Sequence, residues 1–146
     1  MIEVVATHPD HIGIVAENMR AIDRRECGAF GQSPLEALAE AVDRSLWSLT
    51  ALKDGVPHAI MGVVPRNMIE GHGIPWFLGT DQVYTRPVSL IRFGKVVIAE
   101  MRGSFTTLEN FVSVENDRAI RFLRHFGWDI SEETYSIGGV EFVRFG

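Results

Sequence analysis

Two histidines and one cysteine have side chains whose types could support metal binding or nucleophilic chemistry. His8 and His11 are three residues apart and could share one helix face, but no third ligand follows at a suitable spacing. Metal binding is therefore not expected. Cys27, the only cysteine, follows Arg24 and Arg25, which could lower the pKa of its thiol. No nucleophile motif surrounds Cys27, so we expect it to be buried in the core.

A run of charged residues lies just before this cysteine. Arg24, Arg25 and Glu26 are adjacent, and two neighbouring arginines could bind an acidic ligand or partner. A run of charges on a helix is more typical of a solvated face with local ion pairs. Both interpretations stay open from the residues alone.

The segment from residue 108 to residue 128 combines a strand with a helix. Phe111 and Val112 are residue types that favour a pleated, half-buried strand. From residue 119 onward the apolar side chains recur at helical spacing. Asn116 is predicted to cap this helix, and Gly127 to end it in the left-handed conformation. A strand that leads directly into a capped amphipathic helix is half of a ligand-binding α/β unit.

The remaining segments predict a mixed α/β fold. Ser33-Pro34 is a helix start signal, and Asp54-Gly55 predicts a hairpin turn. Pro65 is expected to end the return strand, so that residues 67–75 form a loop or short irregular strand. The predicted strands span residues 2–6, 46–53, 56–64, 76–79, 108–114, 128–137 and 140–145, and the predicted helices span 9–27 (with a bend), 34–45, 87–102 and 117–126.

Composition sets further limits on the protein. A chain of 146 residues is long enough for one domain with its own core. The formal net charge of -5 argues against a general nucleic-acid binder, although a local basic stripe is compatible with it. One cysteine permits no intrachain disulfide, which favours a reducing compartment. The first residues do not resemble a signal peptide, and no apolar run is long enough to span a bilayer. We therefore expect a cytosolic type of domain.

Two groups of residues resemble a known superfamily. The sequence Asn116-x-x-Ala119-Ile120-x-Phe122-Leu123-x-x-Phe126-Gly127-Trp128 is similar to the late motif of the GNAT (Gcn5-related N-acetyltransferase) superfamily. The segments Trp76 to Asp81 and Leu108 to Asn110, taken with this helix, resemble a small phage and prophage family of GNAT-like proteins, which includes an internal virion protein of short-tailed phages. The resemblance implies a single GNAT-like domain over residues 1–146, with a mixed central sheet flanked by helices in the order β-α-α-β-β-β-α-β-α-β-β.

The resemblance also implies an acetyl-CoA site between the fourth and fifth strands. Backbone N–H groups at the start of the following helix would hold the pyrophosphate, and donors near Leu78 to Thr80 would polarise the thioester carbonyl. In the matching loop Gln82 fits the family pattern, but Thr85 and Pro87 replace glycines, and proline has no N–H to donate. Arg86 could contact phosphate or be a solvated charge. The implied cofactor-binding residues are Leu78, Gly79, Thr80, Gln82, Arg86 and Asn116.

Catalytic residues are harder to assign from the resemblance. Leu123 stands where active members often have a tyrosine that acts as general acid, and leucine cannot transfer a proton. Tyr84 could replace it only if its loop folds toward the site. Glu109 and Asp81 are the candidates for a general base, and Glu109 and Asn110 should point to opposite faces of their strand. Alternatively, Glu109 pairs with an arginine and Asp81 caps its connection.

Two functions therefore remain open. The first is a degenerate acetyltransferase fold with a virion-structural or morphogenesis role, located in the host cytoplasm or the virion. The alternative is an active acetyl-CoA-dependent N-acetyltransferase that acts on an unknown amine, with Arg24 and Arg25 near its acceptor pocket. A pseudo-enzyme that inhibits a host factor is a third possibility. Expected partners are phage structural proteins or a second copy, without general nucleic-acid or membrane binding.

Overall fold

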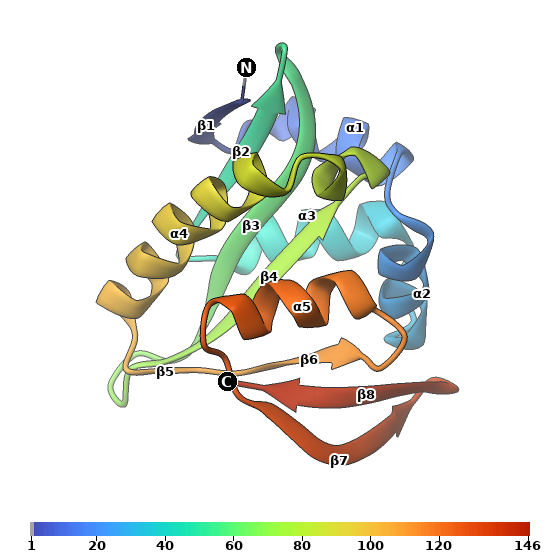
Figure 1. The fold of residues 1–146 in the computed structure, drawn as a ribbon, viewed down its shortest axis with the longest axis vertical. Coiled ribbons are helices and arrows are strands. Elements are labelled where there is room, and N and C mark those ends of the chain that lie inside the picture. Colours follow the sequence, from blue (N-terminus) through green and yellow to red (C-terminus); the bar gives the residue numbers. More distant parts are fainter. Residues whose placement is uncertain (1) are drawn as a thin grey trace.

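A computed structural model describes residues 2–146 and contains two β-sheets that diverge from each other. Figure 1 shows β4 and β6 separating from the end of the molecule where β5 lies. The first sheet has the order β1 (Ile2–Ala6), β2 (Trp47–Lys53), β3 (Val56–Asn67), β4 (His72–Gly79) and β5 (Thr107–Leu108); the second has the order β6 (Asn110–Ser113), β8 (Val140–Phe145) and β7 (Ile130–Ile137).

The hairpin between β2 and β3 forms where the turn signal predicts it. Asp54 and Gly55 have φ angles of 52° and 79°, as a two-residue hairpin turn of the primed type requires. The next pair, β3 and β4, is also antiparallel, whereas β4 and β5 are parallel and pair only through His72 and Gly73. Among the described residues, β4 has no further strand neighbour on that edge, because β6 pairs with β8 instead.

Helices cover both faces of the first sheet. They are α1 (Pro9–Glu17), α2 (Ala21–Ala29), α3 (Pro34–Arg44), α4 (Pro87–Ser104) and α5 (Asp117–His125), with a short 3-10 helix, η1 (Asp81–Thr85), before α4. Ile60 of β3 packs against the cluster formed by α1 and α3, whereas its neighbours Ala59 and Met61 pack against the cluster of α4 and α5. Since successive side chains of a strand point to opposite faces, α1 and α3 lie on one face and α4 and α5 on the other (Figure 1).

The helices α4 and α5 pack closely through one glycine. A Cβ atom placed on Gly94 of α4 would lie only 2.5 Å from Cζ of Phe122 and 3.0 Å from Cε2 of Phe126, both on α5. Only glycine permits this separation. The two helices therefore form one layer over the diverging strands.

The predicted mixed α/β order is confirmed, but several boundaries are wrong. Pro65 does not end β3, because its missing N–H lies on the β2 side beyond Val63, the last residue of β3 that pairs with β2. Residues 67–75, predicted as a loop or a short irregular strand, consist of the end of β3, a turn and the first half of β4. The predicted bent helix at 9–27 is two helices, separated at Met19, which pairs with Thr80 as an isolated bridge. The predicted strand at 108–114 is divided into β5 and β6. Within residues 2–146, no helix is long and apolar enough to cross a membrane.

Candidate functional site

A cavity of about 270 Å³ lies where β4 and β6 separate. Its apolar walls include Phe77 of β4, Phe111 of β6 and Leu123 of α5. One wall is polar and consists of side chains from α2 and from the residue that caps α5. Concave, mostly apolar cavities with a few convergent polar groups are the usual form of small-molecule sites. The polar wall is therefore the part of the molecule where chemistry would be expected.

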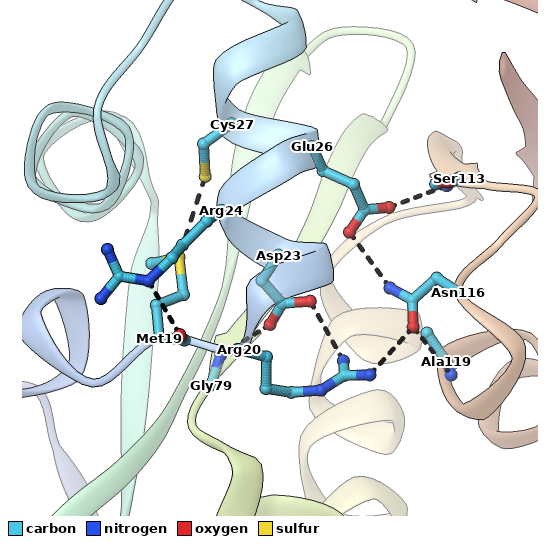
Figure 2. A network of polar contacts seen from close by, with 10 residues as sticks. All are labelled: Met19, Arg20, Asp23, Arg24, Glu26, Cys27, Gly79, Ser113, Asn116 and Ala119. Carbon is cyan, nitrogen blue, oxygen red and sulfur yellow. Dashed lines mark hydrogen bonds and ion pairs between the residues drawn. The ribbon is translucent and has the colours of Figure 1, made fainter. Parts of the chain in front are cut away.

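The centre of this wall is Arg20, directly before α2. Its guanidinium donates to Oδ1 of Asp23 at 3.0 Å and to Oδ1 of Asn116 at 3.2 Å (Figure 2). Arg20 is 8% exposed, Asp23 2% and Asn116 3%. A buried ion pair is stable only when its remaining donors and acceptors are also satisfied. The further hydrogen bonds of these three residues satisfy those donors and acceptors.

Glu26 extends the network from the next turn of α2. Its two carboxylate oxygens accept from the Ser113 backbone N–H at 2.7 Å and from Nδ2 of Asn116 at 3.1 Å (Figure 2). Asn116 also accepts from the Ala119 N–H as the N-cap of α5. The cap predicted from sequence is confirmed, and it has a second role. Through Asn116, the network joins α2 to the junction between β6 and α5.

The same network occupies the edge of β4 that faces β6. The Gly79 N–H donates to Oδ2 of Asp23 at 3.1 Å, and the Gly79 carbonyl accepts from the Arg20 N–H at 2.9 Å. Phe77 and Pro75 lie two and four positions before Gly79 on β4. The Pro75 carbonyl accepts a hydrogen bond from Nδ2 of Asn110 at 2.7 Å. Backbone groups alternate in direction along a strand, so these three residues present their backbone to the edge that faces β6. We call the backbone groups of Pro75, Phe77 and Gly79 the open edge.

Burial changes the protonation of the two carboxylates. Burial raises the pKa of Glu26 to about 7, although the Ser113 N–H opposes the shift. Burial also raises the pKa of Asp23 to about 6, against the opposing effects of Arg20 and the Gly79 N–H. Two carboxylates thus share one guanidinium in a water-poor wall. Carboxylates with pKa values in this range are typical of functional sites, and also of structural ion networks.

Tyr84 closes one side of the cavity. The loop from Gln82 to Arg86, where Thr85 stands in place of a glycine of the family's phosphate loop, is mostly η1, which carries the Tyr84 ring between β4 and α5. The Arg20 guanidinium lies 4.4 Å from the ring centroid, and the Phe77 ring 6.4 Å. Tyr84 therefore does fold toward the site, but burial raises the pKa of its hydroxyl above its ordinary value. A higher pKa makes it a weaker proton donor.

The implied cofactor residues do not all line one cavity. Leu78 and Asn116 line the large cavity, whereas Gln82 and Arg86 line a separate cavity of about 40 Å³. The Thr80 N–H donates to the His58 carbonyl at 2.9 Å, and the Thr80 hydroxyl accepts from the Gln82 N–H as the cap of η1.

These contacts decide whether acetyl-CoA fits. The Gly79 and Thr80 donors, which the resemblance assigns to the thioester, are both engaged inside the protein. Pro87 is the first residue of α4 and offers no N–H to a phosphate. In this conformation the Gly79 and Thr80 N–H groups are therefore not available to a thioester.

The two proposed bases lie outside the cavity wall. The Glu109 side chain is 41% exposed, and its Oε2 lies 3.8 Å from Nε of Arg144. Asp81 is exposed in the first turn of η1. Neither lines the cavity, so their catalytic assignment remains a prediction. The carboxylates that do line it are Asp23 and Glu26, which the sequence presents three residues apart after Arg20, a spacing that places all three on one helix face.

The arginines of the charged run make local contacts, and Cys27 is buried as expected. Arg24 donates to the backbone carbonyls of Met19, Ala16 and Glu17 at the end of α1. Arg25 forms an exposed ion pair with Glu115 at 2.6 Å. Burial raises the pKa of the Cys27 thiol to about 11, which is opposite to the lowering considered from sequence. Within residues 2–146, no cluster of three or more histidine, cysteine, aspartate or glutamate side chains could hold a metal ion.

Comparison with known families and structures gives two findings. The model of a family described as "Bacteriophage T7, probable scaffold protein Gp13" matches residues 59–135, slightly more than half of the chain. No curated protein sequence matches significantly.

The fold is that of GNAT acetyltransferases, as the sequence predicted. Ard1 from Thermoplasma volcanium superimposes with a TM-score of 0.70 at 14% identity, covering 99% of this chain and 96% of that chain. The ribosomal-protein-S18-alanine N-acetyltransferase from Escherichia coli gives 0.69 at 15% identity, with 99% and 92% covered. The spermidine N-acetyltransferase from Vibrio cholerae, solved in complex with CoA and spermine, gives 0.64 at 13% identity, with 99% and 93% covered. At these identities the similarity defines the fold alone.

Proposed function

We propose that this chain, which belongs to the family described as the bacteriophage T7 probable scaffold protein Gp13, is a phage-type assembly protein that uses the GNAT fold without acetyl-CoA chemistry. The scaffold description belongs to the family, and we extend it to this chain as a hypothesis. In this role the protein acts in the infected cell or the virion, on phage structural proteins.

The contact between Asp23 and Gly79 is the observation that carries the proposal. A GNAT enzyme needs free backbone donors beside the thioester carbonyl, because developing negative charge on that oxygen must be stabilised by preorganised hydrogen bonds. In this chain the Gly79 donor is held by a buried carboxylate at 3.1 Å. An ionised acceptor forms a stronger hydrogen bond than a neutral carbonyl. Acetyl-CoA would have to displace it and leave Asp23 buried with one donor fewer.

Other features of the site support the same conclusion. Asn110 holds the Pro75 carbonyl at the other end of the open edge. Tyr84 fills the space between β4 and α5, and Leu123 has no proton to transfer. Each group has a structural role in closing or lining the cavity. Together these groups occupy or line the space in which the resemblance places acetyl-CoA.

An active N-acetyltransferase is the second candidate, and one observation favours it. The Phe77 backbone faces a cavity of about 270 Å³, and the same cavity is lined by Glu26, whose pKa is about 7. A carboxylate with such a pKa is suited to accept a proton from an amine near neutral pH. This enzyme would require the Asp23 contact with Gly79 to open when the cofactor binds.

Calorimetric titration with acetyl-CoA separates the two candidates. The assembly proposal predicts no binding heat and no thermal shift at millimolar acetyl-CoA. Micromolar binding, about -8 kcal/mol, followed by acetyl transfer to an amine that is lost in Glu26→Gln, would instead establish the enzyme. The assembly role is then tested directly by asking whether tagged protein is incorporated into phage particles or their precursors.

A further inference from the structure

The outer surface of α4 and α5 carries a concentration of positive charge. These two helices contain six arginine and lysine side chains against two carboxylates, a formal excess of four positive charges. All six are exposed. The chain as a whole has a formal charge of -5, so this surface is opposite in sign to the rest of the protein. We call it the basic face, defined by Arg92, Lys95, Arg102, Arg118, Arg121 and Arg124.

Most of these side chains have no internal acidic partner. Within residues 2–146, none of Arg92, Lys95, Arg121 and Arg124 lies within ion-pair distance of a carboxylate. Arg102 and Arg118 donate only to backbone carbonyls, those of Phe126 and Tyr84. The charge of the basic face is therefore available to another molecule.

A surface of opposite sign lies on α1 and α3. These helices carry five carboxylates and one arginine, a formal excess of four negative charges. All five carboxylates are exposed. Arg44 is paired with Glu40 at 3.3 Å, so it neutralises one of them. We call this surface the acidic face, defined by Asp10, Glu17, Glu36, Glu40 and Asp43.

The two faces point away from each other. The helices α1 and α3 pack on the Ile60 side of β3, and α4 packs on the Ala59 and Met61 side. One copy therefore cannot neutralise its own faces. The basic face of one copy can instead meet the acidic face of another, and such head-to-tail contacts produce rings or open filaments.

Exposed apolar side chains lie on both sets of helices. Val88 and Val96 on α4 are 65% and 58% exposed, and Leu35 on α3 and Ile14 on α1 are 54% and 40% exposed. Surface ion pairs alone contribute little to affinity, whereas the burial of such side chains is favourable. Complementary charge would then orient the encounter, and apolar contact would stabilise it.

We propose that this protein associates head to tail with further copies of itself, the basic face of one copy contacting the acidic face of the next. We infer a second copy as the partner because its acidic face has the charge that complements the basic face. This self-association rests on the proposed assembly role, for which it names a second copy of the chain as a partner. Its test involves no acetyl-CoA, so the failure of either idea can be recognised separately.

Sedimentation velocity over a range of protein concentrations tests the proposal. Wild-type protein should associate at about 50 mM salt and do so at least tenfold more weakly at about 500 mM, where screening is strong. The double variant Lys95→Glu with Arg121→Glu lowers the formal charge of α4 and α5 from +4 to zero. The double variant Glu17→Lys with Asp43→Lys raises the formal charge of α1 and α3 from -4 to zero. Glu17 and Asp43 lie in the last turns of their helices, where lysine is favourable.

Mixing the variants gives the decisive comparison. Each double variant alone should be monomeric. An equimolar mixture should associate, because the first retains the native acidic face and the second the native basic face. Glu132→Lys with Glu141→Lys is the control for Glu17→Lys with Asp43→Lys, since it makes the same change of +4 in formal net charge at exposed positions outside both faces. It should associate like wild type.

Three results would overturn the proposal. The first is wild-type protein that stays monomeric at high concentration and low salt. The second is double variants that associate as wild type does. The third is a monomer that binds a duplex oligonucleotide in a salt-dependent manner and loses this binding in Lys95→Glu with Arg121→Glu. That outcome would assign the basic face to nucleic acid.

Discussion

The Asp23 carboxylate accepts a hydrogen bond from the Gly79 backbone N–H at 3.1 Å, across 56 positions of sequence. This contact places a charge from α2 on the open edge of β4, at the point where the two sheets separate. The same carboxylate pairs with Arg20, which in turn binds Asn116 at the start of α5. Three elements that surround the cavity are thus held by one buried group.

Removal of this carboxylate should be strongly destabilising. In Asp23→Ala, Arg20 stays buried without its ionic partner and the Gly79 N–H loses its acceptor, so we expect the free energy of unfolding to fall by about 3 to 5 kcal/mol. Urea denaturation measures this value. The matched control is Arg25→Ala, which breaks the exposed pair with Glu115 and should cost no more than about 1 kcal/mol. Equal losses in the two variants would show that the buried network contributes no more to the free energy of unfolding than an exposed ion pair does.

The pH dependence of stability should report the protonation of Glu26. The pKa of this group is raised from 4.5 to about 7 by folding, so between these values the native state binds more protons than the unfolded state. Its contribution to stability is therefore complete below about pH 4.5 and is lost as the pH rises toward 7. In Glu26→Gln the free energy of unfolding should vary less over this window than in wild type, by about 1 to 3 kcal/mol.

Urea denaturation of both proteins at several pH values checks this difference. Only the change with pH is compared, because the amide also loses one of the two hydrogen bonds that Glu26 accepts. Glu115→Gln, the same substitution at an exposed position, controls for the loss of one carboxylate. Parallel curves for wild type and Glu26→Gln would contradict the assignment of the titration to this residue.

The close packing of α4 on α5 predicts an unusual response to alanine. Alanine normally stabilises a helix relative to glycine by up to about 1 kcal/mol. At Gly94, however, the added Cβ would lie 2.5 Å from Cζ of Phe122, and overpacking of this kind costs about 1 to 3 kcal/mol. We expect Gly94→Ala to lower the melting temperature. Gly103→Ala is the control in the same helix, since nothing lies within 4 Å of its added Cβ, and it should raise the melting temperature; an increase in both variants would rule out the tight contact.

Local signals in the sequence were sufficient for the fold class. Ser33-Pro34, Asn116 and Gly127 mark helix ends through contacts within a few residues, and each is confirmed as a cap or a left-handed residue. The prolines were misleading, because whether proline breaks a strand depends on its neighbours. Pro65 lies beyond the last residue of β3 that pairs with β2, and Pro75 has its missing N–H on the open edge. Neither condition can be recognised from the sequence, because both depend on which strands pair and in which register.

The polar wall could not be predicted for a related reason. Asp23 and Glu26 belong to a charged segment that is typical of a solvated helix. Their burial depends on Gly79, Ser113 and Asn116, which are distant in sequence and approach only after the sheets have formed. The spacing of Arg20, Asp23 and Glu26 was a detectable sign of a shared helix face. It does not specify what that face contacts.

Amide hydrogen exchange at Gly79, with and without millimolar acetyl-CoA, tests the central claim most directly. If Asp23 permanently holds this donor, the Gly79 amide should exchange slowly, its rate should not change with acetyl-CoA, and Asp23→Ala should accelerate it about tenfold or more relative to the Thr80 amide, which bonds to His58. A fast-exchanging Gly79 amide that becomes protected when acetyl-CoA is added would show a donor available to the cofactor. That result would contradict the assembly role and identify the protein as a cofactor-binding GNAT enzyme.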